Sequence, residues 1–176
     1  MSTVWYFAYG SNMQTATFRG RRGIAFRRAL PARAAGWRLV FDKPSLLAVG
    51  EAYANIVADA AAEVLGVLYE IGADDLGHLE ATEGVPLGNY ARREIAVEPL
   101  AAAAGVPPSA VTFVSVQRDP SLRPSTRYVE LVVAGAREHG LPAAWIAFLE
   151  SVPARPETPA AARLRLLLDD LMKRRR

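Results

Sequence analysis

The hydrophobic periodicity of this chain changes at Pro124, and this change limits the folds available to it more than any other feature. Before Pro124, apolar residues form short runs or alternate with polar residues, a pattern typical of β-strands. After it, they recur at spacings of three and four residues, as on a helix with one buried face. Strands in the first two-thirds and helices in the last third predict an α+β fold rather than a doubly wound sheet.

The individual elements follow from these patterns and from the turn residues between them. Strands are expected over residues 4–9, 37–42, 54–58, 63–71, 90–97 and 110–117. Helices are expected over residues 13–19, 73–83, 128–139, 142–149 and 159–176. We expect Asn12 to cap the first helix. Gly135 lowers the stability of its helix by up to about 1 kcal/mol relative to alanine.

The length of the chain, 176 residues, suits one domain with a sizeable core, and no linker divides it. We therefore expect a single domain over 1–176, with a C-terminal helix of about 159–176 packed on it or on a second subunit. No segment approaches the ~18 uninterrupted apolar residues of a membrane helix. The N-terminal apolar run lacks the basic region of a signal peptide, so a cytoplasmic protein without a membrane partner is expected.

The residue types that are absent limit the chemistry. The chain has no cysteine, which excludes disulfides, thiol nucleophiles and thiolate metal sites. Its two histidines, His78 and His139, are far apart in the sequence and lie in no recognisable motif. A carboxylate is therefore the natural proton carrier, and no metal site is expected.

Arginines are concentrated in one stretch. Seven of them lie between Arg19 and Arg38, with no acidic residue among them. This stretch is either a solvated surface, which we favour, or a contact for nucleic acid, for an acidic part of a substrate or for a carrier protein. Nucleic acid is not expected as a partner, because the aromatic motifs and zinc fingers that read it are missing.

The first candidate functional segment is the turn after the N-terminal strand. The strand breaks at Gly10 and enters a helix at Asn12, which leaves several backbone N–H groups unpaired. Such a turn binds a carboxylate, a phosphate or a developing oxyanion. The alternative is that this segment is an ordinary strand-to-helix turn with no role in binding. Ser11 is not expected to be a nucleophile, because Tyr9 and Met13 occupy the glycine positions of the Gly-x-Ser-x-Gly motif.

The second segment surrounds Glu83, which is expected in the last turn of the 73–83 helix. The negative end of the helix dipole disfavours a carboxylate there. If the apolar residues over 85–90 also desolvate it, both effects favour the protonated carboxyl, which suits a proton shuttle. The alternative is a surface glutamate paired with Arg92 or Arg93.

Together these segments resemble the γ-glutamylcyclotransferase family. The resemblance rests on motifs that occur in the family's order across about residues 4–150. They are Tyr6-Phe7-Ala8-Tyr9-Gly10-Ser11-Asn12, Gly66-Val67-Leu68-Tyr69, Glu83-Gly84-Val85, Gly88-Asn89-Tyr90, Pro124-Ser125-Thr126-Arg127-Tyr128 and Gly140-Leu141-Pro142. The resemblance implies a small mixed β-barrel flanked by helices, with a substrate cavity at one end.

The resemblance also implies roles for particular residues. Glu83 corresponds to the catalytic acid and base, and the Tyr9–Asn12 loop, which includes Gly10 and Ser11, to the part that holds the glutamyl group. Tyr90 and Tyr128 are further substrate-binding candidates. In the implied reaction, the α-amine of a small γ-glutamyl substrate attacks its own γ-carbonyl and releases 5-oxoproline and a free amine. One carboxylate can carry both proton transfers, so no metal or organic cofactor is needed.

The substrate remains open at this point. The sequence Ser11-Asn12-Met13 favours γ-glutamyl amino acids or peptides, because relatives that act on intact glutathione or γ-glutamyl amines have other residues after Tyr-Gly. Two alternatives are the removal of a γ-glutamyl protecting group in natural-product synthesis and a non-catalytic member of the fold that binds a ligand. A homodimer through the C-terminal helix also stays open.

Overall fold

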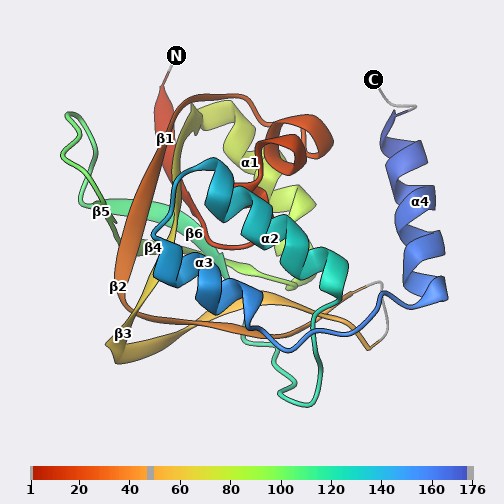
Figure 1. Cartoon of the computed structure of the whole chain (residues 1–176). Coiled ribbons are helices and arrows are strands. Elements are labelled where there is room, and N and C mark those ends of the chain that lie inside the picture. Colours follow the sequence, from red (N-terminus) through yellow and green to blue (C-terminus); the bar gives the residue numbers. More distant parts are fainter. Residues whose placement is uncertain (1, 47–49, 174–176) are drawn as a thin grey trace.

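A computed structural model describes residues 2–46 and 50–173 of the chain (Figure 1). Within these residues, one curled sheet has six strands in the order β4-β6-β1-β3-β2-β5. The strands are β1 (Thr3–Ala8), β2 (Phe26–Pro44), β3 (Ala52–Gly72), β4 (Ala91–Ala96), β5 (Glu98–Pro99) and β6 (Ser109–Val114). Strands β1 and β6 are parallel, and the other neighbours are antiparallel. The sheet is therefore mixed, as expected.

Helices flank this half-barrel. They are α1 (Ala73–Thr82), α2 (Thr126–Glu138), α3 (Ala143–Glu150) and α4 (Pro159–Lys173), with short helices at Ser11–Met13, Ala16–Arg21 and Val85–Leu87. In Figure 1, α2 and α3 lie side by side across the curled sheet, and α4 stands apart from them. The α+β class and the barrel-like sheet with flanking helices are confirmed. No helix in the described part of the chain has the length and hydropathy of a membrane span.

The long hairpin of β2 and β3 differs most from the sequence prediction. We expected only residues 37–42 in one strand and two separate strands at 54–58 and 63–71, but β2 has 19 residues and β3 has 21. Residues 59–62 carry no strand pattern, because three alanines follow an aspartate there and alanine is uncommon in strands. Pairing of β2 with β3 on both sides of this stretch keeps the backbone extended.

The helix expected over 13–19 with Asn12 as its cap is also wrong. The chain instead forms a 3-10 turn at Ser11–Met13 and a π-helical turn at Ala16–Arg21. Gly10 occupies the N-cap position of the first turn and makes no side-chain cap. Asn12 is buried and uses its side chain for contacts with distant residues, which local sequence patterns cannot reveal.

Gly135 explains how α2 holds the turn after β1. A Cβ atom on Gly135 would lie 2.6 Å from the backbone nitrogen of Gln14 and 2.7 Å from the Cβ of Met13. Glycine therefore lets the helix backbone approach the chain that follows Asn12. Gly135 lowers the stability of α2, as expected, but its lack of a side chain allows the turn after β1 to pack closely against the helix.

Candidate active site

Glu83 lies where α1 ends and occupies the C-cap position. The chain reverses at Gly84, whose φ of 71° is readily adopted only by glycine. The Glu83 side chain is 12% exposed. Its Oε1 atom accepts a 2.9 Å hydrogen bond from Nδ2 of Asn12 and lies 3.0 Å from Nη2 of Arg22. The two segments singled out in the sequence thus meet at one carboxylate.

Asn12 connects the parts of this site. Its Nδ2 atom also donates to the hydroxyl of Tyr6 at 3.0 Å, so both amide protons have partners. Its Oδ1 atom accepts a 2.8 Å hydrogen bond from Nε of Arg22. Because every polar atom of the buried amide is used, the side chain is held in one orientation.

Arg22 is a site residue that the sequence did not single out. Besides its contacts with Glu83 and Asn12, it donates from Nη1 to the carbonyl of Thr82 at 3.0 Å. The ring of His78 contacts its carbonyl oxygen at 2.8 Å. The sequence placed Arg22 only within an arginine-rich stretch, and no local signal distinguishes it from its neighbours.

The surroundings of Glu83 differ from both sequence-based alternatives. Glu83 is not a surface residue paired with Arg92, because Arg92 contacts Glu80 at 3.3 Å. The site is not purely apolar either, since Leu87 is 76% exposed and a guanidinium contacts the carboxylate. This guanidinium places a positive charge beside the carboxylate.

Two tyrosines converge on the backbone of one residue of β3, Ala54. The hydroxyl of Tyr90 donates to the carbonyl of Ala54 at 2.9 Å, and the hydroxyl of Tyr128 accepts from the nitrogen of Ala54 at 3.2 Å. The main chain of Ser11 also hydrogen-bonds the Tyr128 hydroxyl. Burial raises the pKa of Tyr128 to about 12 and that of Tyr90 well above its usual value, so both are neutral phenols.

The loop after β1 packs directly on Tyr128. A Cβ atom on Gly10 would lie 3.0 Å from the Tyr128 hydroxyl and 3.3 Å from the Cβ of Ala54. Tyr9, at the start of the loop, is buried, and its hydroxyl donates to the carbonyl of Phe113 on β6. The Tyr9 hydroxyl is therefore already engaged, and Tyr9 contributes to the packing around the loop.

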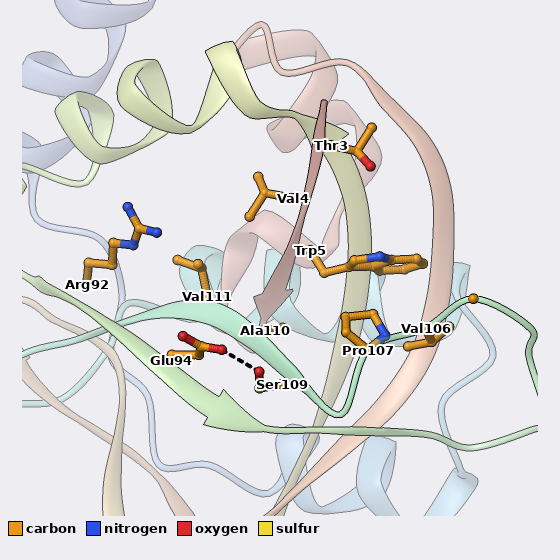
Figure 2. A pocket seen from close by; sticks show the side chains of 11 residues that line it. Thr3, Val4, Trp5, Arg92, Glu94, Val106, Pro107, Ser109, Ala110 and Val111 are labelled. Atoms are coloured by element: carbon orange, nitrogen blue, oxygen red, sulfur yellow. Dashed lines mark hydrogen bonds between the residues drawn. The ribbon is translucent and has the colours of Figure 1, made fainter. Parts of the chain in front are cut away.

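A hollow lies away from the candidate site residues. A cavity of about 600 Å³ is lined by residues of β1, β4 and β6 and by residues 105–107 (Figure 2). Glu94 and Ser109 are hydrogen-bonded to each other in its wall. None of the candidate site residues lines it. In the part of the chain that the structure describes, no group of three or more histidine, aspartate or glutamate side chains is placed to hold a metal ion.

Comparison with known proteins identifies the family. Residues 63–149 match the AIG2-like family. A γ-glutamylcyclotransferase of Bos taurus is 30% identical over 153 residues, which are 84% of this chain and 77% of that protein. The chain belongs to the γ-glutamylcyclotransferase family. A solved structure of a γ-glutamyl cyclotransferase has a TM-score of 0.79 at 26% identity. The aligned region covers 98% of this chain and 99% of that chain.

A second relative in the γ-glutamylcyclotransferase family is longer than this chain. A γ-glutamyl cyclotransferase of Aspergillus oryzae is 31% identical over 164 residues, and the match covers 82% of this chain but only 59% of that protein's length. The AIG2-like match contains Glu83, Tyr90 and Tyr128, while the Tyr9–Asn12 loop and Arg22 precede it. The candidate site of this family member therefore combines residues from inside and outside the matched segment.

Proposed function

We propose that this protein is a γ-glutamylcyclotransferase that acts on γ-glutamyl amino acids or peptides, with Glu83 as its proton carrier. The main support is the environment of the Glu83 carboxylate, which is anchored through Oε1 by Asn12 and Arg22. Among the described residues, no side chain or backbone group donates a hydrogen bond to Oε2. A carboxylate fixed through one oxygen presents the other to a substrate.

The proton transfers can be assigned to this second oxygen. Oε2 of Glu83 removes a proton from the α-ammonium of the substrate, and the freed lone pair attacks the γ-carbonyl carbon. A five-membered ring forms as the C–N bond of the γ-amide breaks. The α-nitrogen loses two protons in all: one reaches the leaving nitrogen through Glu83, and the other is taken up by solvent or by the released amine. Arg22 helps to hold the carboxylate in place for this transfer.

The remaining requirement is a folded substrate conformer. Ring closure is intramolecular and has a high effective molarity once the chain is folded back. We assign this task to the Gly10–Asn12 loop and to Tyr128. The Tyr128 hydroxyl accepts hydrogen bonds from Ala54 and Ser11, so its own proton can point to a substrate oxygen. Its raised pKa keeps that proton on the phenol, which makes Tyr128 a hydrogen-bond donor rather than a base.

A 5-oxoproline release assay tests the proposal. The protein is incubated with γ-glutamyl dipeptides, glutathione and γ-glutamyl amines, and 5-oxoproline and the free amine are measured together. We expect equal amounts of both products from the dipeptides. Absence of 5-oxoproline from every substrate would reject the function. Release only from larger γ-glutamyl conjugates would instead favour the removal of a protecting group.

A further inference from the structure

Lys43 is a fully buried lysine beside the candidate site. It lies at the end of β2, after a register shift between Val40 and Lys43, and its exposure is 0%. Its Nζ atom donates to the carbonyl of Pro44 at 2.6 Å and to the side-chain oxygen of Asn89. It also lies 5.1 Å from the centre of the Tyr90 ring. Lysine is rarely buried to this extent without a partner of opposite charge.

Among the residues that the structure describes, no counterion is adjacent to the charge of Lys43. Its ammonium forms no ion pair with any carboxylate of the described residues, since both of its hydrogen-bond acceptors are neutral. Burial lowers the pKa of Lys43 to about 8, and the negative charge of Glu83 acts in the opposite direction. The Tyr90 ring also lies close to it, and Tyr53 is the residue paired with Lys43 in the β2–β3 register. Glu83 is therefore the carboxylate whose charge acts on the pKa of Lys43.

A hydrogen-bonded connection joins Lys43 to the backbone of Glu83. The oxygen of the Asn89 side chain accepts from Lys43, and its nitrogen donates to the Glu83 carbonyl at 2.9 Å. The backbone nitrogen of Asn89 donates to the carbonyl of Gly84 at 3.0 Å. A Cβ on Gly84 would lie 2.9 Å from the Cβ of Asn89, so the turn closes tightly around this side chain. The end of β2 is thus tied to the end of α1.

We propose that Lys43 is a positioning residue for Glu83. It fixes the Glu83 backbone through Asn89, and its positive charge attracts the Glu83 carboxylate. Lys43 acts through Glu83 rather than on a ligand, because no part of its side chain is exposed. This inference rests on the function proposed for Glu83 and assigns a further residue to it.

Two variants of Lys43 separate the two effects. Lys43→Met removes the charge and the hydrogen bonds, whereas Lys43→Gln removes the charge but keeps a donor for Asn89. Replacing a buried charged group by an apolar one of similar size is often tolerated by the fold. We expect Lys43→Met to lower kcat by about tenfold or more, as misplaced reacting groups do, with little change in KM. Lys43→Gln should recover most of kcat.

The pH profile gives a readout that a purely structural role would not move. The positive charge of Lys43 is lost as the pH rises through about 8, so kcat of the wild type should decline there, and this decline should be absent from both variants. Arg118→Gln is the matched control, because Arg118 binds Asp42 beside the same bulge. It should leave kcat and the decline near pH 8 unchanged. A wild-type pH profile and unchanged kcat in both Lys43 variants would reject the proposal.

A second measurement does not depend on activity. The chain has one other lysine, Lys173, so the Lys173→Arg variant carries Lys43 as its only lysine. Its ammonium signals can be followed by NMR as the pH changes. The midpoint should lie near 8 and should fall when Glu83→Gln is added, because Glu83 raises the pKa of Lys43. An unchanged midpoint would reject the coupling. Absence of 5-oxoproline release by the wild type would instead reject the proposed function.

Discussion

Asn12 and Glu83 are 71 residues apart in the sequence, yet their side chains share a 2.9 Å hydrogen bond. Asn12 belongs to the turn after β1, and Glu83 caps the end of α1. The bond joins two motifs that are individually weak signals and makes them parts of one site. Predictions about either motif therefore test the arrangement of both.

The first prediction concerns the proton carrier. Glu83→Gln keeps the size of the side chain but cannot exchange a proton, so 5-oxoproline formation should fall by about 100- to 10,000-fold. Circular dichroism and the melting temperature should show an intact fold. Near-normal turnover in this variant would contradict the role of Glu83.

The second prediction concerns the guanidinium that contacts Glu83. Arg22→Gln removes the guanidinium that lies 3.0 Å from the Glu83 carboxylate and that also donates to Asn12 and to the Thr82 carbonyl. The Glu83 side chain then loses a contact that holds it in place, so kcat/KM should fall by about tenfold or more, as misplaced reacting groups do. Steady-state kinetics with a γ-glutamyl dipeptide measure this loss.

Arg19→Gln is the control for Arg22→Gln. Arg19 lies in the π-helical turn that ends just before Arg22, but it stacks over the ring of Phe26 and donates to the Phe26 carbonyl. This variant should keep the wild-type kcat/KM. A similar loss in both variants would mean that the general positive charge of this stretch, and not the Arg22 contact, is responsible.

The third prediction concerns Tyr128. Tyr128→Phe removes the hydroxyl that Ala54 and Ser11 orient, and with it a neutral donor to the substrate. KM should rise by about two- to tenfold, which corresponds to the free energy of one ordinary hydrogen bond. The value of kcat should stay close to that of the wild type. Steady-state kinetics with a γ-glutamyl dipeptide measure both constants. A large loss of kcat at constant KM would show a catalytic role instead.

The fourth prediction concerns the contact between α2 and the loop. Alanine is a better helix former than glycine, but a Cβ at position 135 would lie 2.6 Å from the nitrogen of Gln14. Gly135→Ala should therefore destabilise the protein by roughly 1–3 kcal/mol in urea unfolding, as overpacking does. Gly77→Ala in α1 is the matched control, because nothing lies within 4 Å of its added Cβ. It should stabilise the protein by up to about 1 kcal/mol. Equal effects of the two substitutions would show that the Gly135 contact is not a tight one.

Sequence patterns predicted most of the helices and strands for a physical reason. An amphipathic helix or a half-buried strand repeats its apolar residues at the period of its backbone, so α1, α2 and β6 appear at or near their expected positions. The long hairpin was missed because part of β3 is alanine-rich and exposed, and its strand conformation depends on pairing with β2. The helix expected over 13–19 failed because Asn12 bonds to distant groups instead of its own turn.

The sequence by itself determined the α+β class, the family and a short set of candidate residues, because ordered motifs and periodicity are local properties. Whether those residues catalyse the reaction stays a prediction. Only the tertiary structure decided which cations lie near Glu83. Arg22 contacts its carboxylate from the end of the π-helical turn, and Lys43, at the end of β2, is linked to its backbone through Asn89. Attraction between charges depends on distance in space, and no local pattern distinguishes these two cations from the others in the chain.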